Sequence, residues 1–178
     1  MRRLAALVMV LAALPATVAG QTPPSFPRHI PSSGGEVVIP SARHQREYDE
    51  VGYAPARRAG DTLYVSGAIV FRAPGEGHDR EALEQQVRRT FTQLGRTLEA
   101  SGVTFEDVAL LNSFHVWDGP DFTGARSEQT AAIAKVWREF ATGPRPAWTA
   151  VGTTGLLAET GIIEIQLTVH APRASAER

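Results

Sequence analysis

The chain has 178 residues, of which 43% are hydrophobic and 21% charged, and its formal net charge is -1. This length accommodates one domain with a real apolar core, with or without appendages. The charge provides no bulk attraction to nucleic acid or to an anionic membrane. Because the sequence contains no cysteine, disulfide bonds, thiol nucleophiles and thiolate metal sites are excluded.

Residues 1–20 have the pattern of a secretory signal peptide. Arg2 and Arg3 precede a short apolar run, residues 4–16, and small residues follow it. The run is too short to span a bilayer, which takes about 20 apolar residues. A buried N-terminal helix or an uncleaved anchor is the alternative interpretation. We expect a cleaved signal peptide, a periplasmic or secreted protein, and no stable membrane insertion.

The next stretch, residues 21–46, is rich in Pro, Ser and Gly. It is typical of a flexible lead, with one short strand expected over 35–40. Residues 43–50 are strongly charged and have no apolar period. We expect a loop or a helical turn there.

A β-hairpin is predicted after this lead. Gly60 and Asp61 provide the turn, and residues 63–70 form a strand rich in β-branched and aromatic residues. Gly67 interrupts that strand. A glycine inside a strand indicates a bulge or the close approach of another group to the backbone.

Two helices are predicted in the middle of the chain. The first spans residues 80–100, with Asp79 as N-cap and Gly102 as its end. The second runs from residue 121 or 122 to 140. The first helix carries a single apolar stripe with steps of three and four residues, formed by Leu83, Val87, Phe91, Leu94 and Leu98.

Three further strands complete the fold. One covers residues 108–117, and two lie within residues 144–171. In the last strand, apolar residues alternate with polar ones, so that Glu164 points away from the core. The order of elements predicts an α+β layer, with helices on one face of a mixed sheet and the other face open.

Glu164 is the most interesting acid in the sequence. On a strand, a carboxylate can position water or act as a general base if burial raises its pKa. A solvated or ion-paired residue is an equally good interpretation. Trp137 is expected in the core, whereas Trp148 lies one strand away from Glu164 and is a candidate pocket wall.

Other catalytic constellations have less support. The five histidines show no metal-ligand spacing, so no metal site is expected. His115 is interpreted as a packed, hydrogen-bonded residue. Ser66 has no local histidine to act as its base and is not expected to be a nucleophile. Arg57 and Arg145 are the nearest candidates for binding an anion. The favoured interpretation of each is an ordinary surface residue.

The combination of motifs resembles the RidA/YjgF family over residues 50–171. The resemblance implies a chorismate-mutase-like α+β fold over residues 47–172, with a short tail at 173–178. It also implies a homotrimer with clefts between subunits, and hydrolysis of reactive enamines and imines such as 2-aminoacrylate without a cofactor. The motifs are Tyr53-Ala-Pro-Ala, Gly60-Asp-Thr-Leu-Tyr-Val-Ser-Gly67, Leu98-Glu-Ala-Ser-Gly102, Pro146-Ala-Trp-Thr-Ala-Val151 and Ile163-Glu-Ile165.

The resemblance assigns roles to individual residues. Tyr53 matches a cleft tyrosine, Ser66 and Gly67 match a Ser-Gly pair that lines the cleft, and Glu164 matches the acid that positions water. Trp148 stands where the family has an arginine that binds the substrate carboxylate. An indole cannot replace that charge and geometry. The chain therefore resembles the branches that lack this arginine, and activity on 2-aminoacrylate is not expected.

Two functional hypotheses remain open at this point. The first is an enzyme that hydrolyses a small, uncharged or aromatic imine, with Glu164 as the catalytic residue and Tyr53, Ser66, Gly67 and Trp148 binding the substrate. The alternative is a non-catalytic, trimeric small-molecule-binding protein. A ribonuclease activity, also attached to the family's name, is not expected because the sequence has no basic stripe.

Overall fold

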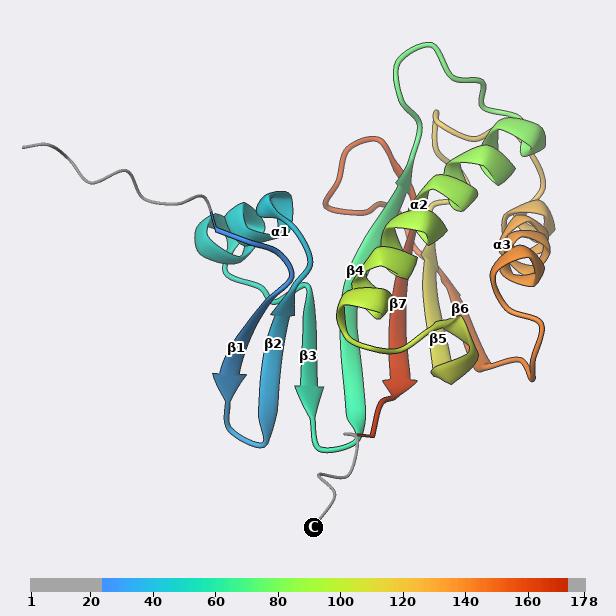
Figure 1. Cartoon of the computed structure of the whole chain (residues 1–178). Coiled ribbons are helices and arrows are strands. Elements are labelled where there is room, and N and C mark those ends of the chain that lie inside the picture. The colour runs from blue at the N-terminus through green and yellow to red at the C-terminus, as the bar shows by residue number, and fades with distance from the viewer. Residues whose placement is uncertain (1–23, 173–178) are drawn as a thin grey trace, which may run out of the picture.

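A seven-stranded sheet carries two long helices on one of its faces (Figure 1). The computed structural model describes residues 24–172, so the expected signal peptide and C-terminal tail lie outside the described residues. The strands are β1 (Arg28–Ser32), β2 (Gly35–Ile39), β3 (Ala56–Ala59), β4 (Thr62–Phe71), β5 (Val108–His115), β6 (Ala147–Gly152) and β7 (Gly161–His170).

The strands lie in the order β1-β2-β3-β4-β7-β5-β6, and every neighbouring pair is antiparallel except β5 and β6. The helices are α1 (Ala42–Arg46), α2 (Arg80–Ala100) and α3 (Arg126–Phe140), with a π-helical turn, η1 (Glu47–Val51), and a 3₁₀ turn, η2 (Phe105–Asp107). The predicted α+β architecture, with the two long helices on one face of a mixed sheet, is confirmed.

The segment expected to be a flexible lead contributes two strands to the sheet, of which β2 confirms the strand predicted over 35–40 and β1 was not predicted. β1 and β2 form a hairpin, and β2 pairs with β3. Val38 and Ile39 are fully buried, so burial of β-branched side chains offsets the cost of ordering a Pro- and Gly-rich segment. The charged residues that follow form α1 and η1, so that of the two expected alternatives, a loop or a helical turn, the helical turn is confirmed.

Helix α2 has the bounds that its sequence predicts. The Asp79 side chain accepts a hydrogen bond from the Ala82 backbone N–H at 2.9 Å, which caps the first turn. Gly102 has a φ of 73°, a left-handed conformation that ends the helix at low cost. All five members of the predicted apolar stripe are buried.

Helix α3 starts later than its sequence pattern suggests. Asp121 instead forms an ion pair with Arg72 at 2.8 Å, and Phe122 is buried as part of the preceding loop. The helix begins at Arg126, where the Glu128 carboxylate accepts a hydrogen bond from the Ala125 backbone N–H at 2.8 Å. Tertiary contacts of residues 121 and 122 therefore override the helical period.

The helices and the sheet enclose an aromatic cluster. The ring of Phe91 stacks on Phe105 with centroids 5.4 Å apart, and Trp137 meets Phe91 edge-on at 5.9 Å. Such pairs add about 0.5–1.5 kcal/mol each beyond the burial of their area. Trp137 is buried, which confirms its predicted place in the core.

The opposite face of the sheet is different in character. The alternation predicted for β7 is confirmed, because Ile163 and Ile165 are buried while Gln166 is exposed. We call this second face of the sheet the open face. Glu164 lies on the open face and is partly buried. Tyr64 of β4 is 53% exposed there, on the same side as its cross-strand neighbour Thr168.

Candidate functional site

A bulge in β4 organises the candidate site. Val65 pairs with Leu167 and Ala68 with Ile165, so Ser66 and Gly67 together oppose a single residue of β7. This is the two-against-one arrangement of a β-bulge, which kinks a strand and redirects its side chains. The bulge predicted at Gly67 is confirmed.

The Glu164 carboxylate lies directly over the bulge. A Cβ atom at position 67 would overlap with Oε1 and Cδ of Glu164. Glycine is therefore the residue that leaves room for this carboxylate against the backbone. The close approach predicted at Gly67 is confirmed, and the approaching group is the acid that sequence analysis singled out.

Two hollows share Gly67 as a lining residue. The first, of about 240 Å³, lies beyond the end of β3, where this edge of β4 has no strand partner, between the bulge and helix α2. The second, of about 380 Å³, lies on the open face around Glu164, Phe114 and Leu156. We refer to them as the edge cavity and the open-face hollow. Gly67 therefore borders both hollows, whereas Glu164 itself lines only the open-face hollow.

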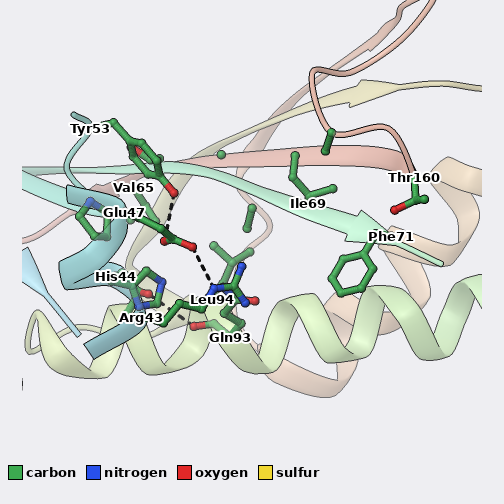
Figure 2. Close-up of a pocket in the computed structure, with 16 residues that line it drawn as sticks. Arg43, His44, Glu47, Tyr53, Val65, Ile69, Phe71, Gln93, Leu94 and Thr160 are labelled. Carbon is green, nitrogen blue, oxygen red and sulfur yellow. Dashed lines mark hydrogen bonds and ion pairs between the residues drawn. The ribbon is translucent and has the colours of Figure 1, made fainter. Parts of the chain in front are cut away.

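A row of polar side chains forms one wall of the edge cavity (Figure 2). Glu47 Oε1 accepts from Nε of Arg43 at 2.9 Å, and Glu47 Oε2 accepts from the Tyr53 hydroxyl at 3.1 Å. Burial, followed by the hydrogen bond to Glu47, raises the pKa of Tyr53, and the charge of Glu164 adds to this shift. The phenol is therefore a neutral hydrogen-bond donor at neutral pH.

His44 also lines this cavity, next to Arg43 on α1. Its Nδ1 lies 2.9 Å from the Ser41 hydroxyl, the N-cap of the helix. Burial is the main cause that lowers the pKa of His44 below its ordinary value of 6.5. The imidazole is therefore uncharged at neutral pH.

Ser66 connects Tyr53 to the strand. Its hydroxyl donates to the carbonyl of Ala54 at 2.6 Å, and its backbone N–H donates to the carbonyl of Pro55 at 3.0 Å. These two bonds fix the segment that presents Tyr53. With its proton used in this way, the Ser66 oxygen is left as an acceptor toward the cavity.

Trp148 lies elsewhere. Its strand partner is Leu111, a buried residue on the helix-covered face, so Trp148 points away from the face that carries Glu164. Together with Arg145, Trp148 lines a separate apolar cavity of about 80 Å³ beside α3. Within one chain, Tyr53, Ser66, Gly67 and Glu164 are brought together and Trp148 is not.

A buried hydrogen-bond chain holds the Trp148 ring. The indole N–H donates to Ser113 Oγ at 2.8 Å, which lies 2.8 Å from His115 Nε2. His115 Nδ1 lies 2.9 Å from Gln129 Oε1, and the amide of Gln129 donates to the Val116 carbonyl at 3.0 Å. These directions are all satisfied when Nδ1 carries the only imidazole proton.

His115 is therefore a packed, neutral residue, as predicted. Burial lowers its pKa, with the hydrogen bond to Gln129 acting in the opposite direction. Ser113 is fully buried, so its contact with His115 gives a substrate no access to the hydroxyl. This pair is a structural network and not a nucleophile with its base.

The sequence pattern did not reveal three residues that lie beside Tyr53 in the edge cavity: Arg43, His44 and Glu47. All three lie in the charged segment that lacks an apolar period. Two signals were present in the sequence, namely Ser41 as an N-cap and the i, i+4 spacing of Arg43 and Glu47. Arg57 and Arg145, the arginines considered in their place, do not line the edge cavity.

Within residues 24–172, no three His, Asp or Glu side chains are placed to hold a metal ion. Over the same residues, none of the helices combines the length and the apolar character needed to cross a bilayer.

The groups around Glu164 on the open face are suited to activating a water molecule. A carboxylate held over a glycine bulge, beside a cavity with a phenol and a serine oxygen, can orient a water molecule toward a bound electrophile. The mixed sheet with helices on one face matches solved structures of the RidA/YjgF family. The chain belongs to that family, because the model described as Endoribonuclease L-PSP (Ribonuc_L-PSP) matches residues 44–171.

Individual relatives agree with this assignment. The RutC family protein YjgH of Escherichia coli K12 is 40% identical over 120 residues, which are 67% of this chain and 83% of that protein. A solved structure of protein YJGH superposes with a TM-score of 0.60 at 33% identity, covering 79% of this chain and 99% of that one. A protein of Dermatophagoides farinae named 2-iminobutanoate/2-iminopropanoate deaminase is 30% identical over 104 residues, 58% of this chain and 74% of that protein.

Proposed function

We propose that the chain hydrolyses a small imine or enamine, and that Glu164 orients and deprotonates the attacking water. The observation that carries the proposal is the position of the Glu164 carboxylate against the Gly67 bulge, which borders the edge cavity and the open-face hollow. The name of the Dermatophagoides farinae relative, 2-iminobutanoate/2-iminopropanoate deaminase, supports the same reaction class.

The reaction needs one base and no redox partner. Water adds to the carbon of the C=N bond, and its proton passes to the carboxylate. The carboxylate returns this proton to nitrogen, which gives a carbinolamine. The carboxylate then accepts the carbinolamine O–H proton and delivers a proton to nitrogen, so that the C–N bond breaks as the C=O bond forms, and ammonia and a carbonyl product leave. General base catalysis of this kind contributes about 10²–10⁴-fold to a rate. Glu164 supplies this function in the proposal.

The residue at position 148 limits which substrates the proposal includes. No arginine occupies position 148, and the indole is engaged with Ser113 on the helix-covered face. A substrate carboxylate placed there would be desolvated without a compensating charge. We therefore propose a substrate without the carboxylate of 2-aminoacrylate, and assign the chain to a branch of the family that lacks this arginine.

We further propose a homotrimer whose subunits share the cleft. Because Trp148 and Glu164 lie on opposite faces of one sheet, both can border one ligand only if they come from different chains. Exposed apolar side chains support an interface, since Val151 on the edge strand β6 is 44% exposed and Leu157 fully so. Light scattering at micromolar concentration tests this part, and a monomeric mass would contradict it.

The pattern of residues 1–20 leads to a proposal on location, namely that the protein acts after export and removal of this segment. Mass spectrometry of the protein isolated from the periplasmic or extracellular fraction tests it. A mature chain beginning near residue 21 is expected, and an intact N-terminus would contradict it.

The reaction is tested with imines generated in situ by an amine oxidase and followed by competition with semicarbazide, which traps the remaining imine. Glu164→Gln is expected to lower the rate of imine consumption about 100-fold or more. Glu159→Gln, an exposed acid in the loop before β7, is the matched control and is expected to retain the full rate. Full activity of Glu164→Gln would rule out the proposed role. Ligand binding by the wild-type protein with no turnover of any imine would favour the alternative, a non-catalytic binding protein.

A further inference from the structure

We infer that the edge cavity binds its ligand as a cation, an iminium or ammonium group, and that Glu47 is the residue that determines this preference. The inference extends the proposed function by naming the charge of the substrate, and it rests on that function only where it calls the ligand an imine. The binding preference for cations stands on the hydrogen bonds of the cavity wall.

Three side chains of the edge cavity, Glu47, Tyr53 and Ser66, present hydrogen-bond acceptors to a ligand. The Tyr53 hydroxyl donates its hydrogen bond to Glu47, and the Ser66 hydroxyl donates its hydrogen bond to the Ala54 carbonyl. Each oxygen therefore has only lone pairs left for a ligand. The two Glu47 oxygens accept one bond each in the structure, which leaves further acceptor capacity. A ligand with several N–H donors satisfies this wall, whereas a carboxylate has none to offer.

The charges around the cavity favour the same class of ligand. Arg43 and Glu47 neutralise each other, His44 is neutral because burial lowers its pKa, and Glu164 on the far side of the bulge adds a negative charge. Solvent does not screen the two members of the ion pair equally. The Glu47 side chain is 22% exposed and that of Arg43 is 62% exposed. The field inside the cavity is therefore dominated by the less screened carboxylate.

Arg43 is not a substitute for the arginine absent from position 148. Its Nε–H, half of the fork that grips a carboxylate side-on, already donates to Glu47. A ligand carboxylate at Arg43 would lie against the Glu47 carboxylate, and like charges at that distance repel. Rejection of an anion and attraction of a cation thus come from the same residue.

The remaining wall suits an apolar body attached to the cation. Ile69 and Phe71 of β4 face Leu94 of α2 across the cavity (Figure 2). With a volume of about 240 Å³, the cavity lies below the range typical of drug-sized ligands, about 300–1,000 Å³. A single ring or a short alkyl chain bearing one protonated nitrogen matches this size and this distribution of polarity.

The preference has a chemical consequence. Protonation makes the carbon of a C=N bond more electrophilic, so a site that binds the iminium form presents water with the more reactive species. Glu47 and Tyr53 act on the nitrogen and Glu164 acts on the water, from opposite sides of Gly67. In this scheme Glu47 is a specificity-determining residue and not a catalytic base.

The test compares three ligands of similar shape and different charge: benzylamine, benzyl alcohol and benzoate. Binding is measured by calorimetry and by the shift in melting temperature, both at pH 7 and without turnover. We expect benzylamine to bind about tenfold or more tightly than benzoate, the difference that one charge-assisted hydrogen bond supplies. Benzyl alcohol should fall between them.

Substitutions test whether Glu47 causes the preference for a cationic ligand. Glu47→Gln should weaken benzylamine binding about tenfold and narrow its margin over benzoate. Glu50→Gln removes the same charge from the same π-helical turn at an exposed position outside the cavity lining, and should leave both affinities unchanged. Tyr53→Phe, which removes an acceptor oxygen and keeps the ring, provides a second variant if Glu47→Gln does not fold.

Equal or tighter binding of benzoate by the wild-type protein would overturn the inference, as would equal effects of Glu47→Gln and Glu50→Gln. Absence of binding by all three ligands would also overturn it. These outcomes are separate from the proposed reaction. Imine turnover that depends on Glu164 can persist without a preference for cations, and a preference for cations can persist without turnover.

Discussion

The two faces of the sheet serve different purposes. The helix-covered face is apolar and closely packed, with aromatic rings in mutual contact and His115 held in a closed hydrogen-bond network. The open face is interrupted by a bulge, carries an acid over a glycine, and exposes large side chains. Close packing is concentrated on the first face, and the proposed reaction is assigned to the acid of the second, because a reacting acid needs room and access that a packed core does not provide.

The largest effect is expected from truncating an aromatic side chain of the core. Phe91→Ala removes a fully buried ring that contacts Phe105, Trp137 and Phe140. It should lower the free energy of unfolding by about 3–5 kcal/mol in denaturant titration. Phe114→Ala makes the same truncation on the open face, where the ring is only partly buried, and should cost clearly less. Equal costs would break the comparison between the faces.

A smaller effect is expected at Trp148. Trp148→Phe keeps most of the apolar ring but removes the N–H that donates to buried Ser113. The loss should be about 0.5–1.5 kcal/mol in the free energy of unfolding, the usual net value of one hydrogen bond. Val151→Ala, on the same edge strand, is the control and removes no hydrogen bond. Unchanged stability of Trp148→Phe would show that the indole network does not hold the ring in place.

The smallest effect is a dependence of stability on pH. Burial lowers the pKa of His115 and His44 in the folded state below 6.5, so the unfolded chain takes up protons more readily. The free energy of unfolding should be at its full value above pH 6.5 and fall as the pH drops below it. Titration between pH 7.5 and 5.5 avoids the range where the carboxylates protonate. His115→Gln should flatten the curve, and an unchanged slope would contradict the account.

The sequence predicted best those features that follow from period and sterics. Asp79 and Gly102 determined the bounds of α2, its apolar stripe predicted the buried side, and the alternation of β7 placed Glu164 on the open face. Gly67 predicted a bulge because a glycine, which has no side chain to pack, weakens a regular strand and commonly marks a kink in it. The choice of Tyr53 and Ser66 as site residues came from the family resemblance, since neither has a distinguishing local pattern.

Other features depend on tertiary contacts that local sequence does not reveal. The face on which Trp148 lies follows from the register of the parallel pair β5 and β6, and a one-residue shift would have reversed it. The cavity residues Arg43 and Glu47 sit in two consecutive short turns stabilised by their own ion pair and by the contact with Tyr53. No apolar period marks such a segment.

The most direct test of the central claim alters the glycine under the acid and leaves the acid in the chain. Gly67→Ala places a methyl group where the Glu164 carboxylate lies, so this flexible side chain must move away from the bulge. Gly155→Ala, in the loop that lines the open-face hollow, meets nothing within 4 Å and is the matched control. Both proteins should fold. The account predicts that imine hydrolysis falls by about 100-fold in Gly67→Ala and stays at the wild-type rate in Gly155→Ala, and equal rates in the two variants would contradict it.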